Sequence, residues 1–194
     1  MKVVLATRNA GKLREVAAIL ADLPIEIVAL PAAVALPPEG DAYEPNAIAK
    51  ALAAARATGG AALGDDSGIE VDALGGAPGP HSARWGGDAL DDAGRNAKLL
   101  AALADVPDAQ RSARYVCVAA LATPDSVVAT ARGVCEGAIL RAPRGAGGFG
   151  YDPVFGLGAR SAAELAPAEK DAISHRGRAF RALADRLRAL AERA

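Results

Sequence analysis

Apolar residues repeat along this chain at two spacings, which predict alternating strands and helices. In 11–22, Leu13, Val16 and Leu20 recur at the three- and four-residue spacing of a helix, whereas residues 2–6 are typical of a short strand. The chain therefore opens as strand, helix, strand. The predicted strands are 2–6, 25–29, 111–122 and 126–136, and the predicted helices are 11–22, 44–58, 89–104 and one that closes the chain from about 175.

Residues 64–68, Gly-Asp-Asp-Ser-Gly, place two adjacent carboxylates between predicted strand segments. A buried strand leads into them, and residues 69–74 then alternate as a half-buried strand does. We expect Asp65 and Asp66 in a solvent-accessible acidic turn. Mg²⁺ takes oxygen ligands, usually one or two carboxylates together with water and substrate phosphates. The turn is therefore a candidate magnesium site, if a phosphate-binding loop accompanies it.

The loop after the first strand, Ala6 to Lys12, has the features of such a phosphate site. It runs into a helix, whose free amide groups and positive dipole end favour an anion. Thr7 and Asn9 can donate hydrogen bonds, and Lys12 can supply the charge. The spacing is not that of a Walker loop, because residue 6 is alanine and Leu13 follows the lysine. A plain helix cap with a solvated lysine is the alternative interpretation.

Composition limits the classes of protein that fit. The chain has 194 residues, 52% of them hydrophobic, which suits one globular domain spanning 1–194. Its net charge of −1 argues against a nucleic-acid partner and favours a small anionic ligand. No apolar run approaches the length of a membrane span, and no leader precedes the first strand, so we expect a cytoplasmic protein. Cys117 and Cys135 are expected to be reduced core thiols.

Lysines are scarce in this chain, which has only five of them among its 22 basic residues. A retained lysine then indicates a need for a compact, mobile point charge, as a phosphate site requires. The five are Lys2, Lys12, Lys50, Lys98 and Lys170.

Four motifs in one order resemble a known family. They are 7–12; 64–68 with 74–79; 147–153, Gly-Gly-Phe-Gly-Tyr-Asp-Pro; and Glu169-Lys170 followed by 173–176, Ile-Ser-His-Arg. Together they make the chain similar to the inosine triphosphate pyrophosphatase family, whose bacterial members are dITP/XTP pyrophosphatases. The resemblance runs from residue 2 to about residue 185, nearly the whole chain.

The resemblance implies an α/β fold, elongated and two-lobed, with a central twisted mixed sheet flanked by helices and the active site in the cleft between the lobes. It implies a homodimer and a reaction in which a non-canonical purine nucleoside triphosphate (dITP, ITP or XTP) is hydrolysed, with Mg²⁺, to the monophosphate and pyrophosphate, cleansing the nucleotide pool. Asp66 would be the catalytic residue and a metal ligand, and Asp65 would support the metal shell. The residues implied to bind substrate are Thr7, Arg8, Asn9, Ala10, Gly11, Lys12, Ser67, Phe149, Gly150, Tyr151, Asp152, Lys170, His175 and Arg176.

The second metal carboxylate is less directly matched. The family supplies a glutamate from the loop before the second helix, and Glu39 fits that position after a one-residue gap, with Glu44 as the fallback. In the later motifs, Phe149 offers a face for stacking a base. Lys170, His175 and Arg176 would complete the pocket, where donors aimed at the C6 oxygen favour keto purines over adenine.

Other functions remain open at this point. A serine hydrolase is disfavoured, because the chain has no GxSxG elbow and Ser174 is adjacent to His175 in sequence. A non-catalytic sensor of purine nucleotides would use the same motifs without turnover. A related house-cleaning pyrophosphatase for modified pyrimidine nucleotides is the nearest competitor among enzymes.

Overall fold

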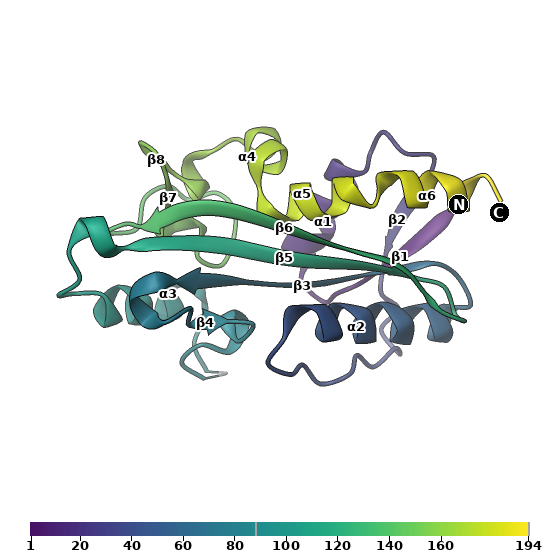
Figure 1. The fold of residues 1–194 in the computed structure, drawn as a ribbon, viewed down its shortest axis with the longest axis horizontal. Helices are drawn as coiled ribbons and strands as arrows, with labels where there is room; N and C mark the ends of the chain where they lie inside the picture. The colour runs from purple at the N-terminus through teal and green to yellow at the C-terminus, as the bar shows by residue number, and fades with distance from the viewer. Residues whose placement is uncertain (88, 194) are drawn as a thin grey trace. The chain divides into compact units, whose positions relative to one another are not determined.

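The computed structural model describes residues 1–87 and 89–193, which form a mixed α/β arrangement around one twisted sheet (Figure 1). Among these residues the strand order is β2-β1-β3-β5-β6-β7-β8, with β4 paired to β3. The strands are β1 (Lys2–Ala6), β2 (Glu26–Ala29), β3 (Ala62–Val71), β4 (Pro78–Gly79), β5 (Ser112–Ala122), β6 (Val127–Ile139), β7 (Phe155–Leu157) and β8 (Arg160–Ser161). The α-helices are α1 (Ala10–Ile19), α2 (Tyr43–Thr58), α3 (Asp92–Ala102), α4 (Pro167–Ile173), α5 (His175–Ala182) and α6 (Ala184–Ala191).

The chain divides into two compact units. Unit 1 comprises 1–66, 117–134 and 171–194, and unit 2 comprises 67–116 and 135–170. The long strands β3, β5 and β6 contribute residues to both units. In unit 1, β1 runs parallel to β2 and to β3, whereas β7 in unit 2 is antiparallel to β6 and β8.

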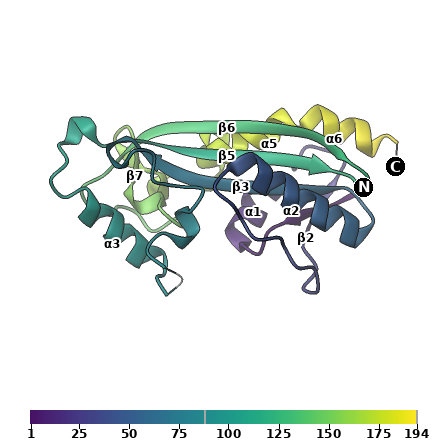
Figure 2. The same ribbon diagram turned by 60° about the horizontal axis from the view of Figure 1, so that its bottom comes forward.

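The sheet of unit 1 is covered on both faces. Val3 and Leu5 of β1 pack in a cluster with residues of α1, α5 and α6, whereas their neighbours Val4 and Ala6 pack with residues of α2. Figures 1 and 2 show α2 on one side of the sheet and α5 and α6 on the other. Burial of both faces explains why β1 is a continuous apolar run instead of an alternating one. Each fully buried leucine, such as Leu5, contributes about 1.5–3 kcal/mol.

Gly64 allows α2 to approach β3 closely. A Cβ atom at this position would lie 2.0 Å from the carbonyl oxygen of Ala47 and 2.9 Å from the amide nitrogen of Ala51. The helix backbone therefore rests directly on the strand. Because Gly64 and Asp66 are two residues apart on a strand, the same face that receives α2 also carries the Asp66 side chain.

The core of unit 2 forms around the other ends of the long strands. Ile69 and Val71 of β3 pack with Leu99 and Leu103 of α3 and its following turn, and with Phe155 of β7. The Phe155 ring also lies against that of Tyr115, with centroids 4.4 Å apart. This core supports the loop that precedes β7.

Most predicted elements are confirmed, with four corrections. The strand predicted at 69–74 ends earlier, because β3 stops at Val71 and Asp72–Leu74 form a 3-10 helix. Residues 64–68 are not a turn: they lie within β3, which runs unbroken from Ala62 to Val71. The closing helix is two helices, α5 and α6, which meet at Leu183, and α4 before them was not predicted. The predicted hairpin is confirmed, since only four residues join β5 to β6, too few for a parallel crossover.

Both cysteines are buried free thiols, as predicted. Within the described part of the chain, no helix has the length and apolarity of a membrane span.

Candidate active site

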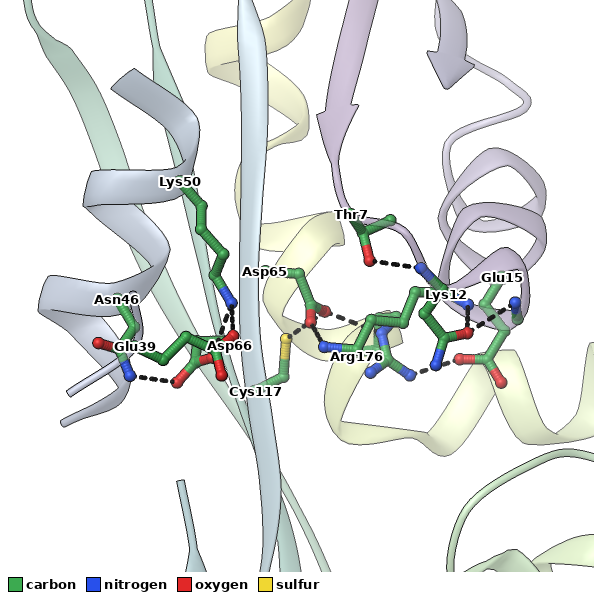
Figure 3. Close-up of polar contacts among 12 residues, drawn as sticks. Thr7, Lys12, Glu15, Glu39, Asn46, Lys50, Asp65, Asp66, Cys117 and Arg176 are labelled. Carbon is green, nitrogen blue, oxygen red and sulfur yellow. Dashed lines mark hydrogen bonds and ion pairs between the residues drawn. The ribbon is translucent and has the colours of Figure 1, made fainter. Parts of the chain in front are cut away.

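The two adjacent carboxylates leave β3 on opposite sides (Figure 3). Successive side chains on a strand point to opposite faces, so Asp66 faces α2 whereas Asp65 faces α1 and α5. Both are buried, with 3% and 1% of their surface exposed, respectively. A strand thus separates two carboxylates that a turn would have placed together.

Asp66 shares one buried lysine with Glu39. The Nζ atom of Lys50 lies 2.7 Å from Oδ1 of Asp66 and 2.8 Å from Oε1 of Glu39. The amide of Asn46 donates to Oδ2 of Asp66 over 3.0 Å. Asn46 also pairs with both backbone groups of Gly40, which fixes the loop that carries Glu39. We call these four side chains, Asp66, Lys50, Glu39 and Asn46, the Asp66 cluster.

The charges of the Asp66 cluster shift its pKa values. Burial raises the pKa of Asp66, and the charge of Glu39 raises it further, against the lowering effect of Lys50 and Asn46; the net shift is upward. Burial lowers the pKa of Lys50, but the charge and hydrogen bonds of Asp66 and Glu39 outweigh it, so that the net pKa is raised. Lys50 therefore stays cationic, while Asp66 accepts a proton more readily than an ordinary aspartate.

Asp65 lies in a more cationic environment. Its Oδ1 accepts from Nζ of Lys12, and its Oδ2 accepts from Nε of Arg176 over 2.9 Å and from the thiol of Cys117 over 3.4 Å. Arg176, itself only 2% exposed, also binds Oε2 of Glu15 over 2.6 Å. Burial would raise the pKa of Asp65, but Arg176 and Lys12 outweigh it and hold the pKa well below its usual range. These five residues, Asp65, Lys12, Arg176, Glu15 and Cys117, form the Asp65 cluster.

The predicted phosphate loop leads into α1, whose N-terminus is capped. Oδ1 of Asn9 accepts from the backbone amides of Gly11 and Lys12, so Asn9 is the N-cap of α1. Oγ1 of Thr7 accepts from the amide of Asn9. Ala10 is the first residue of α1. In this structure the loop is thus a capped helix start, and Lys12 supplies its charge.

Arg8 binds the loop that follows β2. Its guanidinium donates to the carbonyl oxygens of Leu30, Pro31, Ala32 and Val34, at 2.7–3.1 Å. Arg8 thus holds the loop after β2 in this structure, and its contact with substrate stays a prediction.

In unit 2, the predicted base-binding loop is held by Asp152. Its Oδ2 accepts from the amide of Phe149 over 2.9 Å and from Nζ of Lys170, and its Oδ1 accepts from the hydroxyl of Tyr115. The Lys170 ammonium lies 4.9 Å from the centre of the Phe149 ring. A cation at this distance from the ring is attracted by its face. The structure therefore brings together Phe149, Asp152 and Lys170.

Helix α3 holds the same loop at Gly150. The backbone amide of Gly150 donates to Oδ2 of Asp92 over 2.8 Å, and the carbonyl oxygen of Gly150 accepts from Nδ2 of Asn96 over 3.1 Å. The hydroxyl of the buried Tyr151 donates to the carbonyl of Ser82, and burial raises the pKa of Tyr151. Neither Asp92 nor Asn96 was predicted from the sequence.

Comparison with known proteins identifies the family. The model of the Ham1 family matches residues 3–186 of this chain. The chain belongs to the Ham1 family. This confirms the family resemblance seen in the four motifs.

Relatives of this Ham1 chain carry informative names. A protein of Desulforamulus reducens named dITP/XTP pyrophosphatase is 49% identical over 186 residues, covering 93% of this chain and 92% of its own. One of Symbiobacterium thermophilum with the same name is 50% identical and covers 98% and 97%. Among solved structures, a HAM1 protein of Coxiella burnetii has a TM-score of 0.83 at 43% identity, with 96% and 98% covered. A Mycobacterium abscessus nucleoside-triphosphatase / dITP/XTP pyrophosphatase has a TM-score of 0.73 at 47% identity, with 94% and 98% covered.

The remaining predicted site residues of this Ham1 chain have separate settings. His175, 5% exposed, begins α5, whose N-cap is Ser174. Ser67 follows Asp66 in β3 and belongs to unit 2. Glu44, the fallback metal ligand, accepts from the hydroxyl of Thr130 over 2.7 Å. The structure thus places Glu39, and not Glu44, beside the lysine that binds Asp66.

The donor set of the Asp66 cluster fits Mg²⁺. In the residues that the structure covers, no three His, Cys, Asp or Glu side chains group as a metal site. Mg²⁺, however, is usually held by only one or two carboxylates together with substrate phosphates. Asp66 and Glu39 supply two carboxylates, and a Mg²⁺ ion would share them with the Lys50 ammonium, which contacts one oxygen of each. Asp65, which was predicted to support the metal shell, lies on the other side of β3 (Figure 3).

Three residues of these clusters were not predicted from the sequence as site residues: Lys50, Asn46 and Glu15. Asn46 and Lys50 are four residues apart on α2, so they share one helix face, and Lys50 is one of the scarce lysines. That combination is the signal that could have identified them. Glu15 has no such signal, because its partner Arg176 lies far away in the sequence.

Proposed function

We propose that this Ham1-family protein hydrolyses non-canonical purine nucleoside triphosphates, dITP, XTP and ITP, to the monophosphate and pyrophosphate in the presence of Mg²⁺. The observation that carries the proposal is the buried Asp66, whose pKa is raised and which shares Lys50 with Glu39. Ala6 of β1 pairs with Gly64 of β3, so the phosphate loop leaves its strand next to the segment that carries Asp65 and Asp66. The names of the relatives support the choice of dITP and XTP.

The reaction needs a nucleophilic water and a neutralised phosphate. The water attacks the α-phosphorus, the bond from this phosphorus to the bridging oxygen breaks, and pyrophosphate leaves with that oxygen. Asp66 accepts the proton of the water, a task that suits a carboxylate with a raised pKa. Lys12 donates to the phosphate oxygens, and Lys50 orients Asp66. A bound Mg²⁺, held by Asp66 and Glu39, would neutralise charge on the phosphates.

We assign selection of the base to the loop around Phe149. Its ring offers a stacking surface, and Lys170 is a donor suited to the C6 oxygen of hypoxanthine and xanthine. Adenine carries an amino group at C6, so it would leave that donor unpaired. The assignment rests on the motif resemblance and on the contacts that hold this loop within unit 2.

The test is product analysis with defined substrates. The purified protein is incubated with Mg²⁺ and, separately, dITP, XTP, dATP, dGTP, dTTP and a modified pyrimidine triphosphate, and products are separated by chromatography. We expect pyrophosphate and monophosphate from dITP and XTP, with little from the others. Release of orthophosphate would overturn the reaction. A preference for the pyrimidine would overturn the purine assignment, and binding without turnover would indicate a sensor.

The metal and the assembly belong to the same proposal. We expect EDTA to abolish turnover and added Mg²⁺ to restore it, because without a metal ion the carboxylates of Asp66 and Glu39 would repel the triphosphate. We also propose that the protein is a homodimer and that it cleanses the nucleotide pool. Light scattering after size-exclusion chromatography tests the oligomeric state. A monomer with full activity would overturn the dimer without affecting the reaction.

A further inference from the structure

Both oxygens of the Asp65 carboxylate bind protein groups in a closed site. The Asp65 side chain has no exposed surface, one oxygen binds Lys12, and the other binds Arg176 and Cys117. Mg²⁺ keeps several of its own waters and dehydrates reluctantly. A metal ion at Asp65 would therefore have to displace two cations and bring water into a closed site.

Lys12 keeps the capacity to bind a second anion while it binds Asp65. Its side chain is 17% exposed, so solvent reaches it, whereas Asp65 is closed to solvent. An ammonium has three N–H donors, and one bond to Asp65 leaves two for phosphate oxygens. Lysine loses considerable rotamer freedom when its ammonium is ordered, and a fixed partner removes that loss before substrate arrives.

Arg176 and Glu15 complete this arrangement. The guanidinium binds Asp65 through Nε and Glu15 through Nη1, and it is buried between them. Glu15 and Lys12 lie three residues apart on α1, so the helix that follows the phosphate loop is tied twice to the same group of charges. The two cations and two carboxylates sum to zero, which lets a buried cluster persist without a net charge.

We propose that Asp65 is a positioning residue for the phosphate-loop lysine: Asp65, held by Arg176 and Glu15, orients the Lys12 ammonium for the triphosphate and takes no part in metal binding. This inference rests on the proposed triphosphate site. It separates the two adjacent carboxylates of β3 by role, because Asp66 acts on the reacting water while Asp65 acts only through Lys12.

The test is a double-mutant cycle with two readouts. Asp65→Asn, Lys12→Met and the double variant are compared with the wild type for calorimetric binding of inorganic tripolyphosphate and for kcat and KM on dITP. We expect Asp65→Asn to weaken tripolyphosphate binding and raise KM about 10-fold or more, as for one charge-assisted contact, and to change kcat much less. With Lys12→Met already present, Asp65→Asn should have little further effect on either readout.

A control separates positioning from folding. Glu15→Gln also removes one of the two carboxylates that bind Arg176 in the Asp65 cluster, but it leaves the Lys12 and Asp65 pair intact. All variants are measured well below their unfolding temperatures, with circular dichroism as a check. We expect Glu15→Gln to lower stability about as much as Asp65→Asn and to weaken tripolyphosphate binding clearly less. Equal losses of binding in the two variants would overturn the inference.

Two further outcomes are decisive. If Asp65→Asn raises the Mg²⁺ concentration needed for half-maximal activity, and its effect adds to that of Lys12→Met, Asp65 is a metal ligand and the inference is wrong. If the wild type binds tripolyphosphate and Asp65→Asn binds it equally well, the inference fails while the proposed function stands. If the wild type neither binds tripolyphosphate nor hydrolyses dITP, both fail together.

Discussion

Asp65 and Asp66 are neighbours in the sequence, yet their surroundings differ in charge. Asp65 meets two cations, Lys12 and Arg176, and its pKa lies well below the usual range. Asp66 meets one cation, Lys50, which it shares with the carboxylate of Glu39, and its pKa is raised. Burial opposes the charged form in both cases, so the number of neighbouring cations decides the direction of the shift. Asp65 thereby stays ionised to lower pH than an ordinary aspartate, whereas Asp66 accepts a proton more readily.

The largest expected effect comes from removing the proton acceptor. Asp66→Asn keeps the size of the side chain and an oxygen that can accept from Asn46. The new amide at position 66, however, cannot accept a proton from water. We expect kcat for pyrophosphate release from dITP to fall about 10²–10⁴-fold, with an unchanged circular dichroism spectrum. If Asp66→Asn retained wild-type turnover, the distinction between the two carboxylates would have no catalytic meaning.

The next largest effect is on stability, where we expect substitution of Asp65 to cost more than substitution of Asp66. Asp65→Asn leaves the buried Arg176 with Glu15 as its remaining carboxylate in the cluster. Breaking such a buried pair destabilises by about 3–5 kcal/mol. We expect urea unfolding to show this loss for Asp65→Asn and a smaller one for Asp66→Asn. Equal losses would show that the second cation at Asp65 contributes nothing.

The pH dependence of stability should differ in sign between the two positions. The pKa of folded Asp65 lies below its ordinary value of 3.8, so its stabilisation is present above 3.8 and is lost as pH falls through the folded pKa. The pKa of folded Asp66 lies above 3.8, so its contribution is present below 3.8 and is lost as pH rises through the folded pKa.

Unfolding free energies in metal-free buffer over the acidic range measure this difference. The unfolding free energy of the wild type relative to that of Asp65→Asn should increase as pH rises from the most acidic end. Relative to that of Asp66→Asn, it should decrease as pH rises above 3.8. Parallel curves for the two variants would contradict the opposite shifts.

The smallest expected effect tests how the Asp66 side is built. In Gly64→Ala, the new Cβ would meet the backbone of α2 at Ala47, and such overpacking destabilises by about 1–3 kcal/mol. Because α2 carries Asn46 and Lys50, we also expect kcat to fall. Gly60→Ala is the matched control, since a Cβ there meets nothing within 4 Å. If both variants behave alike in thermal unfolding and turnover, close packing at Gly64 is unimportant.

Much of the fold could be predicted from local patterns. The first strand and helix, the strand at 25–29, the second helix and the strand pair at 111–122 and 126–136 all depend on apolar spacing and on nearby glycine or proline, which act within a few residues. The break at Leu183 could not be predicted in this way. The residues from 175 to 191 keep a helical pattern across it, and neither glycine nor proline marks the boundary.

By itself, the sequence determined the family and the residue types that carry the chemistry, because the four motifs are short and contiguous. Only the tertiary structure decided that 64–68 is a strand. Glycines beside acidic residues are typical of turns, but here Gly64 makes room for α2, and Gly68 makes room for the carbonyl of Gly79 in β4, 2.0 Å from where a Cβ would lie. Such contacts join segments far apart in the chain, so no local pattern reveals them. Once the segment is extended, its alternation sends Asp65 and Asp66 to opposite faces, toward cations supplied by α1 and α5 on one side and by α2 on the other.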